Sequence, residues 1–302
     1  MTGFEITSWG AVGVALFGLL MGFLSGLFGV GGGFLLTPGL NILFQMPAPL
    51  AVGTSLCQMI GTATAAVRRH LKLGNVDVKL SLMVMGGALG GVPLGSWAVD
   101  SLKGFGQYVI FGRMVPVVEL VIRMAYLVLL LVMAVLIYRE AHQASLGLRV
   151  TSGPWRGARL RVGPMVRFYG TGDQPVSLFF VAYLSLGIGF LSALLGLGGG
   201  VLLIPALIYL LGVSTRVAVG TSLLQIIFIA AYGTAFRAWA GDVHLGVVVL
   251  TLAGSTVGSQ LGVVLHVKMD PNHIRKYFGL MLAAATLIIL YGIISLGLGP
   301  TV

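Results

Sequence analysis

A series of long apolar segments is the feature that most constrains this chain. Eight segments reach the roughly 20 residues that an α-helix needs to cross the hydrocarbon core of a bilayer. Only 9% of the residues are charged and 57% are hydrophobic, whereas about 25% of a soluble domain is charged. We therefore predict an all-α polytopic membrane protein with eight to ten transmembrane segments. This class excludes a soluble enzyme, a nucleic-acid-binding protein and a disulfide scaffold.

Two further apolar segments are too short to cross on their own. The ten expected segments are 9–29, 33–46, 50–67, 78–99, 115–138, 176–197, 200–212, 215–236, 243–266 and 274–297. Segments 33–46 and 200–212 each begin at a glycine cluster and contain a proline. These features favour a broken or re-entrant helix over a full span.

The chain contains two copies of one pattern, separated by 167 positions. Residues 22–38 (GFLSGLFGVGGGFLLTP) match residues 189–205 (GFLSALLGLGGGVLLIP), and AVGTSL recurs at 51–56 and 218–223. An internal repeat of this kind is typical of transporter folds. We expect a first transmembrane repeat at 9–138, a linker at 139–175 and a second repeat at 176–297.

The distribution of basic residues indicates that the repeats are inverted. Loop 68–79 contains four basic residues, whereas its counterpart 235–246 contains only Arg237. Since basic loops stay in the cytoplasm, we expect loop 68–79 and linker 139–175 inside and both termini outside. The linker arginines are Arg139, Arg149, Arg156, Arg159, Arg161 and Arg167. They set orientation in the simplest interpretation; a surface that meets anionic lipid is the alternative.

The glycine clusters are the first candidate binding elements. Gly31, Gly32 and Gly33, with Gly198, Gly199 and Gly200, interrupt the helices and leave backbone N–H groups without helical acceptors. The positive end of the following short helix would add to an anion site that contains no cationic side chain. An inverted repeat would bring the two clusters together near the midplane. Close helix packing at glycine is the alternative role.

A second pair of candidates lies in the next helix of each repeat. Thr54, Ser55 and Gln58 share one helical face, as do their copies Thr221, Ser222 and Gln225. Hydroxyl and amide groups donate hydrogen bonds to an oxyanion without adding charge. Hydrogen bonding between helices is an equally good explanation of these side chains.

Ionisable residues give weaker signals. Glu119 lies four residues before Arg123, which favours an ion pair at a helix end; a coupling-proton role for Glu119 is the alternative. His70 occupies the repeat position of Arg237, and Asp77 that of His244; we interpret all four as boundary charges, with an anion-attracting vestibule as the alternative. No residues have the spacing of a metal site or a catalytic triad. We therefore expect no cofactor, no metal and no enzymatic activity.

With the duplicated glycine motifs and AVGTSL in view, the chain resembles the TauE/SafE family, the toluenesulfonate uptake permease superfamily. The resemblance covers essentially the whole chain, although segments 101–117 and 139–175 exceed what a minimal member needs. It implies a carrier of the bacterial or archaeal cytoplasmic membrane. The implied substrates are sulfite, sulfoacetate and other organosulfonates, with thiosulfate as a further candidate.

We therefore expect a multi-pass carrier of small sulfur oxyanions in the inner membrane, with the anion and the lipid as its partners. Export is the simple direction, because an inside-negative potential drives an anion outward with about 2.3 kcal/mol per charge per 100 mV. A passive anion channel and a proton- or sodium-coupled uptake permease are the alternatives. A membrane enzyme lacks a nucleophile, metal or haem constellation. A homodimer is compatible with the sequence but does not follow from it.

Overall fold

A computed structural model describes residues 8–110, 113–145, 163–172 and 174–298. Within these residues the chain is almost entirely helical. The helices are α1 (Ser8–Phe28), α2 (Gly33–Ile42), α3 (Ala48–Lys72), α4 (Val78–Lys103), α5 (Val117–Ser145), α6 (Leu178–Leu195), α7 (Gly200–Pro205), α8 (Thr215–Trp239), α9 (Leu245–Lys268) and α10 (Pro271–Leu298). A π-helix, η2 (Ala206–Leu210), continues α7, so one helical segment covers Gly200–Leu210.

Eight of these helices are long and apolar enough to cross a membrane, and the two segments after the glycine clusters are short, as predicted. The exposed faces of the long helices are apolar: on α1, Val12 and Leu16 are more than half exposed. Such a face would be unfavourable in water over this length but suits contact with lipid. The protein is an all-α polytopic membrane protein.

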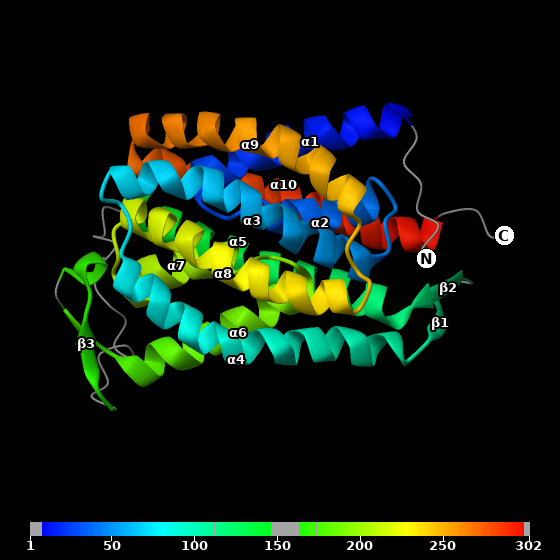
Figure 1. Cartoon of the computed structure of the whole chain (residues 1–302), viewed down its shortest axis with the longest axis horizontal. Helices are drawn as coiled ribbons and strands as arrows, with labels where there is room; N and C mark the ends of the chain where they lie inside the picture. Colours follow the sequence, from blue (N-terminus) through cyan, green and yellow to red (C-terminus); the bar gives the residue numbers. More distant parts are fainter. Residues whose placement is uncertain (1–7, 111–112, 146–162, 173, 299–302) are drawn as a thin grey trace.

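Two short hairpins interrupt the helical pattern. Strands β1 (Gln107–Ile110) and β2 (Arg113–Pro116) pair antiparallel between α4 and α5, where the first repeat has its insertion. Strands β3 (Met165–Arg167) and β4 (Pro175–Ser177) pair antiparallel before α6, with the 3-10 helix η1 (Tyr169–Thr171) between them. We call the two ends of the molecule the hairpin end, with β1 and β2, and the linker end, with β3 and β4 (Figure 1).

Equivalent helices of the two repeats run in opposite directions. The Thr54 hydroxyl, near the start of α3, accepts a hydrogen bond from the His244 N–H at the hairpin end. Its copy Thr221, near the start of α8, accepts from the Asp77 N–H at the linker end. In Figure 1, α1 likewise begins at the hairpin end and α6 at the linker end. The repeats are therefore inverted.

Rows of glycines on α1 and α4 bring helices of the two repeats into close backbone contact. A Cβ on Gly18 of α1 would lie 2.5 Å from the Thr251 oxygen of α9, and one on Gly87 of α4 would lie 2.5 Å from the Ala182 oxygen of α6. The later glycines of these helices repeat the contact turn by turn. Each repeat's first helix thus packs against the other's fourth, at a backbone separation that only small residues allow.

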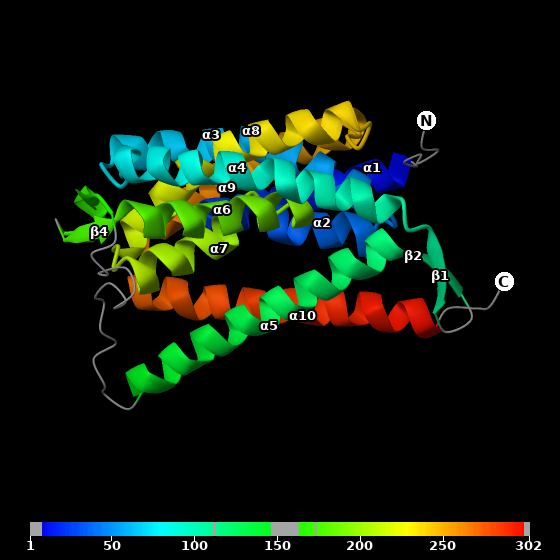
Figure 2. The same ribbon diagram turned by 90° about the horizontal axis from the view of Figure 1, so that it is seen from below.

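Helices α5 and α10 form a separate layer on one side of the molecule (Figure 2). Short helices α2 and α7 lie between this layer and α3 and α8. Arg123 of α5 donates a 2.6 Å hydrogen bond to the Gly292 oxygen of α10, which ties the two long helices together. The layer therefore covers one side of the region in which the glycine clusters lie.

The predicted linker 139–175 differs in part from a simple loop. Helix α5 continues to Ser145, beyond the expected limit of 138, and residues 146–162 and 173 lie outside the described residues, together with Arg149, Arg156, Arg159 and Arg161. The described remainder packs on the start of α4: the Gly170 N–H donates to Asp77 Oδ2 at 2.8 Å. Loop 68–79 and the linker therefore share one end of the molecule.

Candidate functional site

The two glycine clusters are in contact with each other. A Cβ added to Gly33 would lie 2.6 Å from the Gly196 oxygen, and one added to Gly200 would lie 2.8 Å from the Val30 carbonyl carbon. All residues of both clusters are buried. The contact expected from an inverted repeat with two half-helices is therefore present.

Glycine is required in these clusters by the backbone as well as by the packing. Gly31 and Gly32 have φ of 74° and 78°, and Gly198 and Gly199 have φ of 62° and 85°, a region that glycine adopts readily and side chains disfavour. No side chain caps the start of α2 or of α7. The first N–H groups of both short helices therefore remain without a helical acceptor, at the contact between the clusters.

Two apolar side chains fill the space between the clusters. A Cβ on Gly31 would lie 2.6 Å from Met59 Cε and 3.1 Å from Ile226 Cδ1. Met59 and Ile226 occupy the same repeat position and are fully buried. The clusters are thus closed off from solvent. Sequence reasoning missed this pair, although each residue directly follows one of the candidate glutamines.

Thr54 and Thr221 hold the polypeptide loops at the two ends. Their hydroxyls accept hydrogen bonds from the backbone N–H groups of His244 (3.0 Å) and Asp77 (2.9 Å), respectively. Both threonines are fully buried. Their observed contacts therefore connect each repeat to the loop before the other repeat's fourth helix.

Ser55 and Ser222 have different surroundings despite their equivalent positions. The Ser222 hydroxyl contacts the carbonyls of Gly29 (2.9 Å) and Val219 (2.8 Å) as a donor. At the other cluster, the Gly196 oxygen accepts instead from the Thr37 hydroxyl at 3.3 Å. The buried Ser55 hydroxyl has no hydrogen-bond partner within the described residues.

Gln58 and Gln225 differ in the same way. Gln58 Nε2 donates to the Thr62 hydroxyl at 2.6 Å, and Thr62 in turn contacts the Ser255 hydroxyl at 2.7 Å. The positions equivalent to Thr62 and Ser255 are Ile229 and Ala88, which offer no side-chain hydrogen bond. In the part of the chain that is described, neither amide atom of Gln225 has a partner, and Gln58 Oε1 also lacks one.

Two further serines belong to this region and were missed by sequence reasoning. Ser25 of α1 and Ser192 of α6 are fully buried, and the structure, where described, gives neither hydroxyl a partner. A Cβ on Gly32 would lie 3.6 Å from the Ser25 Cβ. Ser25 stands four residues before Gly29, and Ser192 stands four residues before Gly196. This repeated spacing was the signal that could have identified them.

Several side chains in this region have buried polar atoms without a hydrogen-bond partner among the described residues. The side chains concerned are Ser25, Ser55, Gln58, Ser192 and Gln225. Each unsatisfied group costs about 1–3 kcal/mol, so a bound ligand or an ordered water that supplies the missing hydrogen bonds is favoured here. The set contains no charged group, and its hydroxyls and Gln225 Nε2 can donate to an oxyanion, whereas the unpartnered atom of Gln58 is Oε1, an acceptor. The arrangement is therefore suited to a small anion.

Charged residues form two networks near the hairpin end. Arg123 binds Glu119, as the sequence predicted, and donates to Asn41 Oδ1 of α2 at 2.9 Å. Lys103 binds Asp242. A cavity of about 430 Å³ lies between the networks, with Lys103, Glu119 and Asp242 in its lining. This cavity places three charged side chains together at the hairpin end.

The four expected boundary charges lie at the ends of helices, but three are buried. His70 and Arg237 are fully buried, and Asp77 is 4% exposed. Asp77 and His244 cap α4 and α9 by accepting from the N–H groups of Leu80 and Val247. Their burial and bonding assign these residues to contacts between helices and loops.

Comparison with known proteins agrees with this architecture. Residues 14–289 match the family described as "Sulfite exporter TauE/SafE". A "Probable membrane transporter protein YunE" of Bacillus subtilis is 26% identical over 272 residues, covering 86% of this chain and 90% of its own. The "Probable membrane transporter protein MJ0441" of Methanocaldococcus jannaschii is 24% identical, covering 85% and 87%.

A shorter match reaches higher identity. A "Probable membrane transporter protein" of Haemophilus influenzae is 43% identical over 68 residues, which cover 20% of this chain and 26% of that protein. No solved structure matches the chain. The family match covers both repeats and both glycine clusters, and the chain is a membrane transporter that belongs to the TauE/SafE family.

Proposed function

We propose that this transporter is a secondary carrier that exports small sulfur oxyanions, such as sulfite or organosulfonates, across the cytoplasmic membrane. The anion binds where the two glycine clusters meet. Backbone N–H groups of residues 31–33 and 198–200 contribute to the site together with side chains of the first and third helices of each repeat. Thr54 and Thr221 hold the loops that close it.

The observation that carries the proposal is the group of buried, unpartnered hydroxyls and amides around the clusters. Ser55, Ser192 and Gln225 are fully buried and have no hydrogen-bond partner in the described chain. A membrane interior offers no water to satisfy such groups. A tetrahedral or pyramidal oxyanion supplies several acceptor oxygens within a small volume, and so satisfies donors that converge from both repeats.

The unequal bonding of the two repeats supports an asymmetric site. Gln58 Nε2 and the Ser222 hydroxyl are already used within the protein, whereas Gln225 Nε2 and the Ser55 hydroxyl are free to donate. We therefore assign most of the side-chain donors to Ser55, Ser192 and Gln225. Because the donors are neutral, release of the anion does not require separation from a fixed cation.

Closure of the site favours a carrier over a channel. Met59 and Ile226 fill the space between the clusters, and both are fully buried. A passive pore needs a continuous hydrated path, whereas a carrier passes through a closed state and opens at alternate ends. Export requires no coupling ion, because the membrane potential already drives an anion outward.

The test is counterflow in proteoliposomes that contain the purified protein. Vesicles loaded with unlabelled sulfite should accumulate labelled sulfite, and an organosulfonate should compete, whereas a small carboxylate should compete weakly. Counterflow by the carboxylate alone would overturn the substrate assignment. Unitary currents in a planar bilayer, without counterflow, would show a channel instead.

A further inference from the structure

A pair of buried histidines at the linker end occupies the position of an ion-paired arginine at the hairpin end. His70 in the last turn of α3 and Arg237 in the last turn of α8 are equivalent in the repeat and fully buried. Each backbone carbonyl accepts a hydrogen bond from the residue five positions on, Asn75 (3.0 Å) and Asp242 (2.8 Å). The two side chains thus stand at corresponding places at opposite ends of the molecule.

At the hairpin end the buried charge is paired with carboxylates. The Arg237 guanidinium pairs with Asp242 at 3.1 Å and Asp100 at 3.2 Å, and it donates to the Ser96 oxygen at 2.6 Å. These bonds connect α8 to α4. Arginine stays charged at any physiological pH, so this connection does not respond to protons.

At the linker end the corresponding connection contains no ion pair. The His70 ring meets the His266 ring of α9 edge to face, with 5.2 Å between centroids. His266 Nδ1 lies 2.7 Å from the Leu27 oxygen, at the end of α1. The other three ring nitrogens have no hydrogen-bond partner within the described residues. Two imidazoles alone fall short of a metal site, and the described chain places no third ligand beside them.

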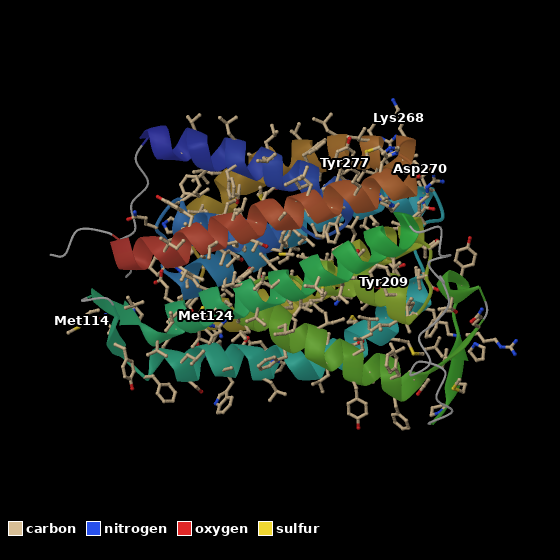
Figure 3. All side chains as sticks on the ribbon, turned by 180° about the vertical axis from the view of Figure 1, so that it is seen from behind. Met114, Met124, Tyr209, Lys268, Asp270 and Tyr277 are labelled. Atoms are coloured by element: carbon tan, nitrogen blue, oxygen red, sulfur yellow. The ribbon has the colours of Figure 1, made fainter. Side chains whose placement is uncertain are left out.

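The charged groups nearest to the two rings would not stabilise a positive charge on either of them. Arg69 of α3 and Arg216 of α8 both repel a cation on these rings. Among the other charged or titratable groups at this end, Arg68, Lys72, Lys79, Lys268, Asp270 and His273 are exposed, and the carboxylate of the buried Asp77 accepts from the N–H groups of Leu80 and Gly170. Figure 3 shows Lys268 and Asp270 together at the linker end, opposite Met114.

We propose that the His70–His266 pair is a proton-binding site that controls opening of the linker end. While both rings are neutral, they form an uncharged contact that holds α3 against α9. A proton on either ring puts an uncompensated cation into a buried site, which is unfavourable until water reaches it. Protonation therefore favours a state in which α3 and α9 separate at this end and the glycine clusters become accessible from the linker side.

Cysteine accessibility measures this opening directly. Ala66 is fully buried and lies one turn before His70 on the same face of α3, so Ala66→Cys is a small change that reports access. The background is Cys57→Ser, which removes the only native thiol. Exposed Lys72→Cys, measured separately, gives the intrinsic pH dependence of alkylation. The quantity of interest is the ratio of the two alkylation rates in the full-length protein.

We expect this ratio to rise by at least about tenfold, equivalent to about 1.4 kcal/mol, between about pH 8 and about pH 5, the range in which imidazole titrates. The double variant His70→Gln/His266→Gln should abolish the rise, each single substitution should reduce it, and the exposed His273→Gln should retain it. A ratio that does not change with pH in the protein with both histidines overturns the proposal. So does a rise that survives both glutamine substitutions, or one that His273→Gln removes.

This proton site is independent of the identity of the transported anion. The alkylation ratio needs no substrate, so its result is separate from that of the counterflow experiment. In proteoliposomes, acidification on the linker side alone should accelerate flux of any accepted anion, and acidification on the hairpin side should not. Equal acceleration from both sides would place the proton site elsewhere.

Discussion

The two equivalent serines of the third helices provide a matched test of the binding site. Ser55 and Ser222 have the same neighbours in sequence, but only Ser222 has hydrogen-bond partners, the carbonyls of Gly29 and Val219. We predict that Ser55→Ala weakens anion binding, whereas Ser222→Ala weakens the fold. Each substitution removes one oxygen atom, so the pair isolates the effect of the surroundings.

The expected changes in affinity and stability follow from the hydrogen-bond partners of each serine. A hydrogen bond to a charged group contributes about 1.5–3 kcal/mol, so Ser55→Ala should raise Kd about 10- to 150-fold. Without ligand, Ser55→Ala removes a buried hydroxyl that has no partner, so the melting temperature should stay the same or rise. Ser222→Ala loses a bond between helices, about 0.6 kcal/mol on average and at most about 1.7. It should melt lower and keep Kd within about threefold.

The assay is a melting curve without ligand and a titration with sulfite or an organosulfonate, on both purified variants and the parent protein. Two results would refute the reasoning. One is a lower melting temperature for Ser55→Ala with unchanged Kd, which would make the hydroxyl a packing group. The other is an equal loss of affinity in both variants, which would show that the difference in their hydrogen bonds is irrelevant to binding.

Four further predictions concern other parts of the molecule. Gln225→Leu should raise Kd at least about tenfold, because an amide donor to a charged ligand is lost, while Gln58→Leu should reduce stability more than affinity; the same titration and melting curve compare them. Gly33→Ala should destabilise the protein by at least about 1–3 kcal/mol, because its Cβ would meet the Gly196 oxygen, whereas Gly86→Ala should be tolerated, since nothing lies within 4 Å; melting temperatures decide. Removing one partner of a fully buried ion pair costs about 3–5 kcal/mol. Arg237→Met should cost somewhat less, because Asp100 is 46% exposed; an unchanged melting temperature would contradict this. An impermeant thiol reagent should label Phe105→Cys in intact cells but Lys72→Cys only after permeabilisation, and the reverse pattern would invert the proposed orientation.

Much of the fold was predictable because membrane insertion and duplication leave strong patterns in the sequence. The length of the apolar segments identified eight spans and two short helices. The offset of 167 paired the helices, and the unequal charge of loops 68–79 and 235–246 indicated the inversion. The β1–β2 hairpin and the extension of α5 to Ser145 were not predicted. The hairpin has no counterpart between α9 and α10, so the repeat gave no information about it, whereas α5 (29 residues) and α10 (28 residues) are nearly equal in length.

In the candidate site, the repeat identifies equivalent residues but does not predict their hydrogen bonds. Duplication placed Ser55 with Ser222 and Gln58 with Gln225, but it could not show which member of each pair is free to bind. That depends on residues where the repeats have diverged: Thr37 opposite Ile204, and Thr62 opposite Ile229. The Thr37 hydroxyl donates to the Gly196 carbonyl, and the Ser55 hydroxyl has no partner in the described chain. The Thr62 hydroxyl accepts from Gln58 Nε2, whereas Gln225 Nε2 has no such acceptor among the described residues.

The same divergence separates the two ends of the molecule. Arg237 and His70 occupy equivalent positions in the two repeats. Arg237 carries a permanent charge that is paired with Asp242, whereas His70 is a titratable ring that packs against the ring of His266. A symmetric pair would make both ends open equally easily. Unequal ends do not set the direction of net flux in an uncoupled carrier, which follows the electrochemical gradient of the anion; they allow the two ends to respond differently to protons. Unequal control of the two ends therefore depends on the differences between the copies, rather than on the duplicated motifs themselves.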